Sequence, residues 1–175
     1  MKVRLFTVAL CLMALSFITN AQSLKIGYVK IEKVFAEWPE IKAADAILVE
    51  YEGNWNSRLQ AKVKDLQAKF ASYQQNRASM DAVTQKDTET ELQNLQTQVQ
   101  QFETNAKQSV SEKNDSLLKP LQNRLQEAID EVAKENGFTH ILNHSSSILF
   151  TSDKSGDISF KVAQKLGFTL SPDGQ

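Results

Sequence analysis

Cysteine is nearly absent from the chain. The only one, Cys11, lies in an apolar run at residues 5–18 that follows two basic residues, Lys2 and Arg4. This run is too short to cross a bilayer core of about 30 Å as a helix, and small residues ending at Ala21 follow it. We therefore expect residues 1–21 to be a secretory signal peptide that is cleaved after Ala21. An uncleaved membrane anchor is the alternative.

The mature chain would then contain no cysteine at all. This absence excludes disulfide bonds, catalytic cysteines and zinc sites built from thiolates. An exported chain without these elements must be stabilised by packing, by a metal or by oligomerisation.

The mature chain also lacks an excess of positive charge. Loss of the two basic residues of the signal peptide leaves 18 Lys and Arg against 21 Asp and Glu. Nucleic-acid binding usually requires a clustered basic face, so we expect no nucleic-acid partner.

Groups that could carry chemistry are scarce. The two histidines, His140 and His144, are four residues apart, but they lie in a predicted strand and turn, where this spacing does not bring them together. No third ligand is near, so we expect no metal site and no cofactor. The serines at 145–147 lack a G-x-S-x-G motif, and we expect no catalytic residues and no enzymatic activity.

Glycine and proline are missing between Asn54 and Lys119, a stretch rich in good helix formers. Apolar residues recur there with spacings of four and three, which predicts long helices with one apolar seam each. The first seam contains Ile41, Leu48, Trp55, Leu59, Val63, Leu66, Phe70, Tyr73 and Met80, and the second contains Leu92, Leu95, Val99, Phe102, Ala106, Leu117 and Leu121.

The segment Asp81–Asp87 interrupts this spacing and predicts a turn, with Thr84 and Asp87 as a capping box for the second helix. An antiparallel hairpin follows, with arms of roughly 40 residues that span about 60 Å. Folding at this turn predicts facing pairs Arg77 with Leu92, Tyr73 with Leu95, Phe70 with Val99, Leu66 with Phe102, and Val63 with Ala106. The seam is thin, so we expect the arm to be only marginally stable and to bend.

Pro120 falls inside the second helical pattern. It either kinks one continuous helix or begins a new helix as its first residue, and the sequence supports both interpretations equally. Trp38-Pro39-Glu40 predicts the start of the first long helix.

The two ends of the chain predict a small body. Residues 24–29, 138–143 and 147–152 read as strands, Gly137 as a helix C-cap, and Asp157 or Ser159 as the cap of a last short helix. The fold class is therefore α+β, with a body at 22–52 plus 121–175 and a helical hairpin at 53–120.

A body of about 80 residues that carries so long an arm is hard to stabilise as a monomer. We expect oligomerisation through the strands, which would also protect their edges. The candidate contacts are Ile26, Tyr28, Val29, Ile141, Ile148 and Phe150.

Three segments resemble the Skp/OmpH family of periplasmic chaperones: IGYVKIEKVFAEWPEIKAA near the start, AIDEVAKENGFTHILN, and Asp157–Ser159 before the last helix. The resemblance covers the whole mature chain. It implies a periplasmic homotrimer whose strands form a β-barrel body, with three helical tentacles around a cavity. It also implies a holdase that binds unfolded outer-membrane proteins without ATP.

The arm departs from the family pattern in its charge. The best-known member has strongly basic tentacles, whereas residues 58–113 contain eight Lys and Arg against seven Asp and Glu. Contact with lipopolysaccharide or membrane lipid is thereby put in doubt. Client binding would instead depend on apolar residues, and the candidates are Trp55, Phe70, Tyr73, Met80, Val83 and Phe102. Trp55 could equally anchor the arm to the body, and the arm aromatics fit the seam better than a surface that faces a client.

A second functional class stays open. The same hairpin could be a structural coiled-coil spacer or adaptor of the cell envelope that binds no unfolded client.

Overall fold

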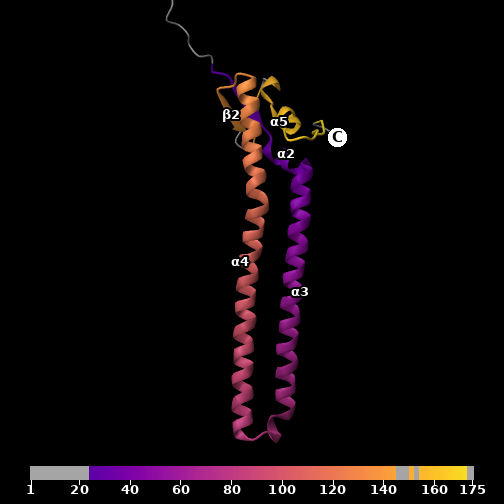
Figure 1. Ribbon diagram of the computed structural model, residues 1–175, viewed down its shortest axis with the longest axis vertical. Helices are drawn as coiled ribbons and strands as arrows, with labels where there is room; N and C mark the ends of the chain where they lie inside the picture. Colours follow the sequence, from indigo (N-terminus) through magenta and orange to yellow (C-terminus); the bar gives the residue numbers. More distant parts are fainter. Residues whose placement is uncertain (1–23, 145–149, 152–153, 173–175) are drawn as a thin grey trace, which may run out of the picture.

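The computed structural model describes residues 24–144, 150–151 and 154–172. A long two-helix arm projects from a small head, and the hairpin turn lies at the end of the arm away from the head (Figure 1). In chain order the elements are β1 (Ile26–Val29), α2 (Ile31–Glu37), α3 (Pro39–Asn76), a 3-10 turn η2 (Arg77–Ser79), α4 (Ala82–Glu135), β2 (His140–Asn143), a 3-10 turn η3 (Lys154–Gly156) and α5 (Ser159–Lys165). Within the described residues, no helix combines the length and apolar character needed to span a membrane.

The predicted long helices are confirmed. The 38 residues of α3 span about 57 Å and the 54 residues of α4 about 81 Å at 1.5 Å per residue. α4 extends beyond the start of α3, so its last turns lie alongside the head (Figure 1).

The two prolines have different roles. α3 begins at Pro39, as predicted, and Trp38 before it adopts an extended conformation that separates α2 from α3. α4 continues through Pro120, so the interpretation of Pro120 as the start of a new helix is wrong. The helix tolerates the missing backbone donor at this one position.

The hairpin turn comes earlier than predicted. α3 ends at Asn76, and Asp81 is the N-cap of α4, where its carboxylate accepts hydrogen bonds from the backbone N–H groups of Val83 and Thr84, both at 2.9 Å. The turn therefore occupies residues 77–81 rather than 81–87, because Asp81 caps the helix and Thr84 lies in its first turn. These hydrogen bonds, those from Thr84 foremost, lower the pKa of Asp81.

The predicted pairing of the two helices is also wrong, by about one heptad. Tyr73 donates a hydrogen bond to Glu89, six residues before the predicted partner Leu95. Lys69 forms an ion pair with Glu91 at the same level of the arm. Apolar seams with a seven-residue repeat align equally well after a shift of seven, so the seam does not define the pairing by itself.

Charge distribution favours the pairing of these two helices. Residues 54–77 carry five basic side chains and only Asp65 as an acid, whereas residues 81–105 carry five acids and only Lys86 as a base. The basic residues are Arg58, Lys62, Lys64, Lys69 and Arg77, and the acids are Asp81, Asp87, Glu89, Glu91 and Glu103. Opposite charges on facing helices attract, although each exposed pair contributes little.

In the head, β1 pairs in parallel with β2, with Ile26 opposite His140 and Val29 opposite Asn143. An isolated parallel bridge joins Tyr28 to Asp157. The hairpin is thus the crossover connection between two neighbouring parallel strands. Of the predicted third strand at 147–152, Phe150 and Thr151 are described and are not in a strand, and the other positions lie outside the described residues.

The head core is centred on Trp38, which is 1% exposed and stacks against Phe35 and Phe168. Its buried neighbours reach down to Ala44 on α3 and Leu121 on α4. The other buried members are Val29, Val34, Leu125, Ala128, Ile129, Val132, Ile158, Val162, Ala163, Leu166 and Leu170.

The two helices that end in the head close in the same way. Gly137 follows α4 with φ 67°, as predicted for a C-cap, and Gly167 follows α5 with φ 88°. The N–H of the next residue, Phe138 or Phe168, donates to a carbonyl of the last helical turn at 2.9 or 3.0 Å. This is the Schellman arrangement, and both phenylalanines then pack against the core.

The pairing of α3 and α4 can be tested by cross-linking, because the mature chain would contain no native thiol. Phe70 and Leu92 line the same groove, so a variant with Phe70→Cys and Leu92→Cys should react rapidly with a short bifunctional maleimide. The matched variant with Phe70→Cys and Val99→Cys, the pair expected from the seam alone, should react far more slowly. Faster intramolecular cross-linking of the second pair would contradict the observed register.

Asp157 ties the last helix to β1, and this link should make the head sensitive to acid. Burial raises the pKa of Asp157, but hydrogen bonds from Ser159 and Lys30 outweigh it and leave the pKa lowered. The Lys30 ammonium lies 3.1 Å from the carboxylate. A lowered pKa stabilises the fold above the unfolded value of about 4, and this stabilisation is lost as the pH falls through the folded value.

Asp157→Asn should therefore lower the melting temperature at pH 7 and flatten its decline on acidification below about pH 4. Thermal unfolding followed by circular dichroism at equal protein concentration measures both effects. The control Asp115→Asn alters an exposed carboxylate on α4 and should retain the wild-type pH dependence. If the melting temperature of Asp157→Asn falls as steeply on acidification as that of the wild type, Asp157 does not cause the acid sensitivity of the head.

Candidate functional site: the apolar seam of the arm

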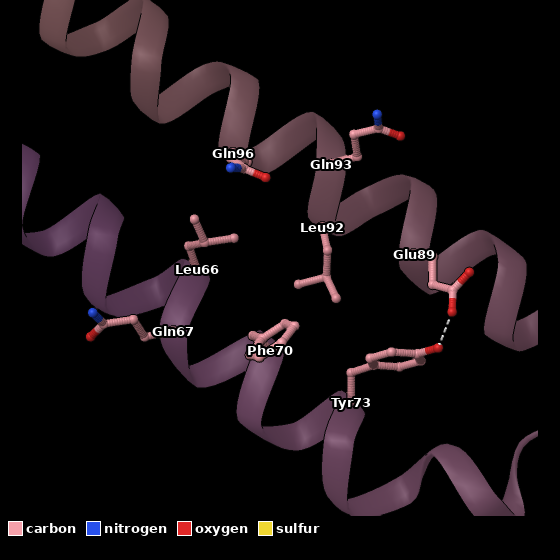
Figure 2. A pocket seen from close by; sticks show the side chains of 8 residues that line it. All are labelled: Leu66, Gln67, Phe70, Tyr73, Glu89, Leu92, Gln93 and Gln96. Carbon is pink, nitrogen blue, oxygen red and sulfur yellow. Dashed lines mark hydrogen bonds between the residues drawn. The ribbon is translucent and has the colours of Figure 1, made fainter.

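The seam between α3 and α4 opens into a groove of about 520 Å³ in the half of the arm near the turn. We call it the distal groove; it is lined by Leu66, Gln67, Phe70, Tyr73, Glu89, Leu92, Gln93 and Gln96. Leu66 and Phe70 from α3 and Leu92 from α4 point toward one another between the helices and form its floor (Figure 2). Phe70 remains 49% exposed, so the seam is not closed over it.

One end of the distal groove is closed by a hydrogen bond from the Tyr73 hydroxyl to Glu89 (Figure 2). Tyr73 is 7% exposed, and the Arg77 guanidinium lies 3.9 Å from the same carboxylate. The hydrogen bond to Glu89 is the main cause that raises the pKa of Tyr73, and burial adds to it. The phenol therefore stays a donor at neutral pH, and this end of the groove is held by an internal polar contact.

A second groove of about 350 Å³ lies nearer the head, between Trp55, Leu59, Ala106 and Val110. Its rim carries charges, among them Glu103 and Lys107, which form an ion pair of 2.7 Å. We call it the proximal groove. The seam residues that line the proximal groove are apolar, as in the distal groove. The two grooves differ in that the rim of the proximal groove is charged.

Three aromatic side chains cluster across the helices near the proximal groove. Trp55 contacts Phe102, with ring centroids 5.1 Å apart, and Tyr51 at 6.3 Å. Arg58 lies over the rings of Trp55 and Phe102, and Lys62 lies over Phe102 at 5.3 Å. Aromatic pairs and overlying cations each add to the stability of such a contact.

The structure distributes the six client-contact candidates over the whole arm. Phe70 lies in the distal groove, and Trp55 and Phe102 belong to the aromatic cluster, both half-buried. Tyr73 is buried in the seam, which leaves little of its surface for a client. Met80 is half-buried at the turn, and Val83 beside it is 70% exposed.

Sequence reasoning missed several groove residues. The seven-residue repeat identifies Leu92 as a seam residue but aligns it with Arg77, so it does not indicate that Leu92 and Phe70 line the same groove. Tyr51 lies before the expected start of the arm at residue 53. The glutamines of the rim had no distinguishing pattern among the many glutamines of the arm.

The oligomerisation candidates divide into two groups. Tyr28 and Val29 are buried within the single chain, and Ile141 is half-buried against its core. Ile26 is exposed and Phe150 is 83% exposed, whereas Ile148 lies outside the described residues. Three further exposed apolar residues of the head, Leu24, Leu142 and Phe160, are not among these candidates.

The histidines do not converge. His140 is exposed beside Thr139, and the ring of His144 packs 5.1 Å from that of Tyr28. Across the described ranges, no three His, Cys, Asp or Glu side chains are placed to share a metal ion.

A long antiparallel helical hairpin with an open apolar seam, joined to a small two-stranded head, defines a class of mostly helical proteins with one elongated arm. The chain belongs to the OmpH-like outer membrane protein family, whose model matches residues 25–166. The resemblance found in the sequence is thereby confirmed.

A crystal structure from Caulobacter crescentus, described as that of an OmpH-like outer membrane chaperone, has the same fold. The TM-score is 0.72, the sequence identity is 14%, and the match covers 86% of this chain and 93% of that one. Comparison with curated protein sequences finds no match.

The aromatic cluster should hold the arm together near the proximal groove. Phe102→Leu keeps an apolar residue but removes the ring contact with Trp55, worth about 1 kcal/mol. Backbone amides around residues 50–60 should then exchange roughly fivefold faster with deuterium, because local opening becomes easier.

The spatial control is Phe70→Leu, which should accelerate exchange near the turn and not near Trp55. Unchanged protection around Trp55 in Phe102→Leu would show that the aromatic contact does not stabilise this part of the arm.

Proposed function

We propose that the protein is an ATP-independent holdase chaperone of the periplasm that binds unfolded outer-membrane β-barrel proteins and keeps them from aggregating. Membership of the OmpH-like family and the described role of the Caulobacter protein support this proposal. The single observation that carries it is the open seam, in which Phe70 stays half-exposed on the floor of a groove.

The arm suits a holdase because its apolar sites are small and separated. The distal groove, the aromatic cluster and Val83 at the turn each offer limited apolar area along one hairpin. An unfolded chain that touches several such sites at once gains avidity, although each contact is weak and reversible. The client is held without being fixed in one conformation.

We further propose that three copies assemble through the heads, with the strands forming a β-barrel and the arms enclosing a cavity. Exposed apolar residues of the head, Ile26 and Leu142 in the sheet and Phe150 after it in the chain, support an interface there. Within the described part of the chain β2 pairs only with β1, which leaves one edge of β2 available to a neighbouring copy. Three arms would multiply the contacts available to one client.

The chain would reach the periplasm by export, with cleavage after Ala21. Nucleic acid, metal and cofactor have no part in the proposal, and neither does catalysis. The arm carries nearly balanced charge between residues 58 and 113, so lipopolysaccharide and membrane lipid are not proposed as partners.

The test is suppression of aggregation of a urea-denatured outer-membrane β-barrel protein that is diluted into buffer with the mature chain. Stoichiometric protein should prevent light scattering. Because apolar contacts dominate, raising the salt concentration until the Debye length falls to about 3 Å should leave the suppression largely intact.

The alternative, a structural spacer, predicts no suppression and recovery of a stable folded partner instead. Loss of suppression at high salt would show that charge, rather than the open seam, holds the client.

A further inference from the structure

We propose that the distal groove is a subsite for an extended, uncharged polypeptide segment: one apolar side chain enters between Leu66, Phe70 and Leu92, and the rim glutamines bond the backbone beside it. This inference rests on the proposed function, because it names the chemistry that a client must present at this groove. It also assigns a role to the glutamines of the arm.

The floor accepts one apolar side chain. Leu66, Phe70 and Leu92 converge from the two helices, and the groove volume of about 520 Å³ falls within the range of about 300–1,000 Å³ typical of ligand sites (Figure 2). Tyr73 and Glu89 close one end, so a segment would lie against the remaining open side.

The rim carries unused hydrogen-bonding capacity. Within the described residues, the side chains of Gln67, Gln93 and Gln96 form no hydrogen bond. Gln96 lies beside the space between the helices, whereas Gln67 and Gln93 extend outward from theirs (Figure 2). Both are exposed, so they would reach a bound segment by a change of rotamer, which exposed side chains undergo within nanoseconds. Each amide offers two N–H donors and a carbonyl acceptor, which together match the N–H and C=O groups of an extended backbone.

Three other glutamines of α4 are engaged within the helix itself. Gln101, Gln108 and Gln126 donate to Asn105, Glu112 and Asp130, one helical turn further along, at 3.0, 2.8 and 2.7 Å. At the rim, the corresponding positions after Gln67, Gln93 and Gln96 are Ala71, Thr97 and Gln100, none of them acidic. The rim amides therefore remain available to a ligand.

Charge indicates which ligand fits. Of the eight residues that line the distal groove only Glu89 is charged, and it already accepts the Tyr73 hydrogen bond. The aromatic cluster, in contrast, has Arg58, Lys62 and Lys113 over its rings. The distal groove thus offers no cation to an anionic lipid or an acidic peptide, and an uncharged segment with alternating apolar side chains suits it best.

The test compares two probes on the mature, full-length protein. The first is an N-acetylated, C-amidated peptide of alternating Leu and Ser, and the second is the same peptide with N-methylated backbone amides. Binding is followed by NMR through the side-chain amide signals of Gln67, Gln93 and Gln96. The unmodified peptide should bind about three- to tenfold more tightly, as expected for loss of about one neutral hydrogen bond.

Variants assign this preference to the rim. Gln67→Met, Gln93→Met and Gln96→Met combined keep the length and helix propensity of the side chains but remove the amides. The ratio of the two affinities should fall close to one, whereas the control with Gln98→Met and Gln100→Met, two exposed positions outside the groove, should retain the wild-type ratio. If the combined variant loses helical content, two measurements on the wild-type protein test the proposal instead. These are the ratio of its affinities for the two peptides and the chemical-shift changes of the side-chain amides of Gln67, Gln93 and Gln96 when peptide binds.

A wild-type ratio of one, or a ratio preserved in the combined variant, would overturn the subsite. Glutamine signals that shift with protein concentration in the absence of peptide would place a second copy in the groove, and would also overturn it. The scattering assay tests the holdase proposal independently. If that proposal is wrong, the outer-membrane barrel protein aggregates in the assay even when the protein binds the unmodified peptide more tightly than the N-methylated one.

Discussion

Two helices that pack only on each other cannot bury their apolar faces completely, and the rest of the structure follows from this constraint. A helix in a compact core is covered from several sides, whereas each helix of the arm has one partner along most of its length (Figure 1). The seam residues are accordingly half-buried, and the few that are buried are either small, as Ala106 is, or hold a polar contact, as Tyr73 does. A surface of this kind stays soluble only if its surroundings are polar. Glutamines and paired charges meet that need.

The arm and the head are therefore held by different means. The head has a packed core around Trp38, sealed by two glycine caps and by the Asp157 link to β1. Arg124 on α4 reaches the junction, where it lies over the Trp38 ring and pairs with Glu40 at the start of α3. Beyond this point the seam depends on scattered contacts and on charges that are opposite on the two helices. The head is therefore packed from several sides, whereas the arm is held by contacts along a single seam.

The sequence predicts the long helices because a sustained heptad repeat without glycine or proline leaves little alternative. It does not predict their pairing, because seams with a seven-residue repeat align at every heptad, and only the cap at Asp81 and the charges on Lys69 and Glu91 choose among them. The predicted register, which differs from the observed one by about one heptad, places Leu92 away from Phe70. It therefore does not predict the distal groove. In the head, β1 and β2 follow from β-branched and aromatic runs, but no local pattern indicates that they pair in parallel across the whole hairpin.

That parallel pairing has a consequence for how the chain folds. β1 and β2 are neighbours in the sheet, yet Val29 and His140 are separated by the entire arm, and closing so long a loop in an unfolded chain is entropically unfavourable. Zipping of the hairpin from its turn proceeds through contacts that are close in sequence at first and brings the two strands together at the end. The arm then guides the folding of the head, because β2 comes to lie beside β1 only when the last turns of α4 have formed.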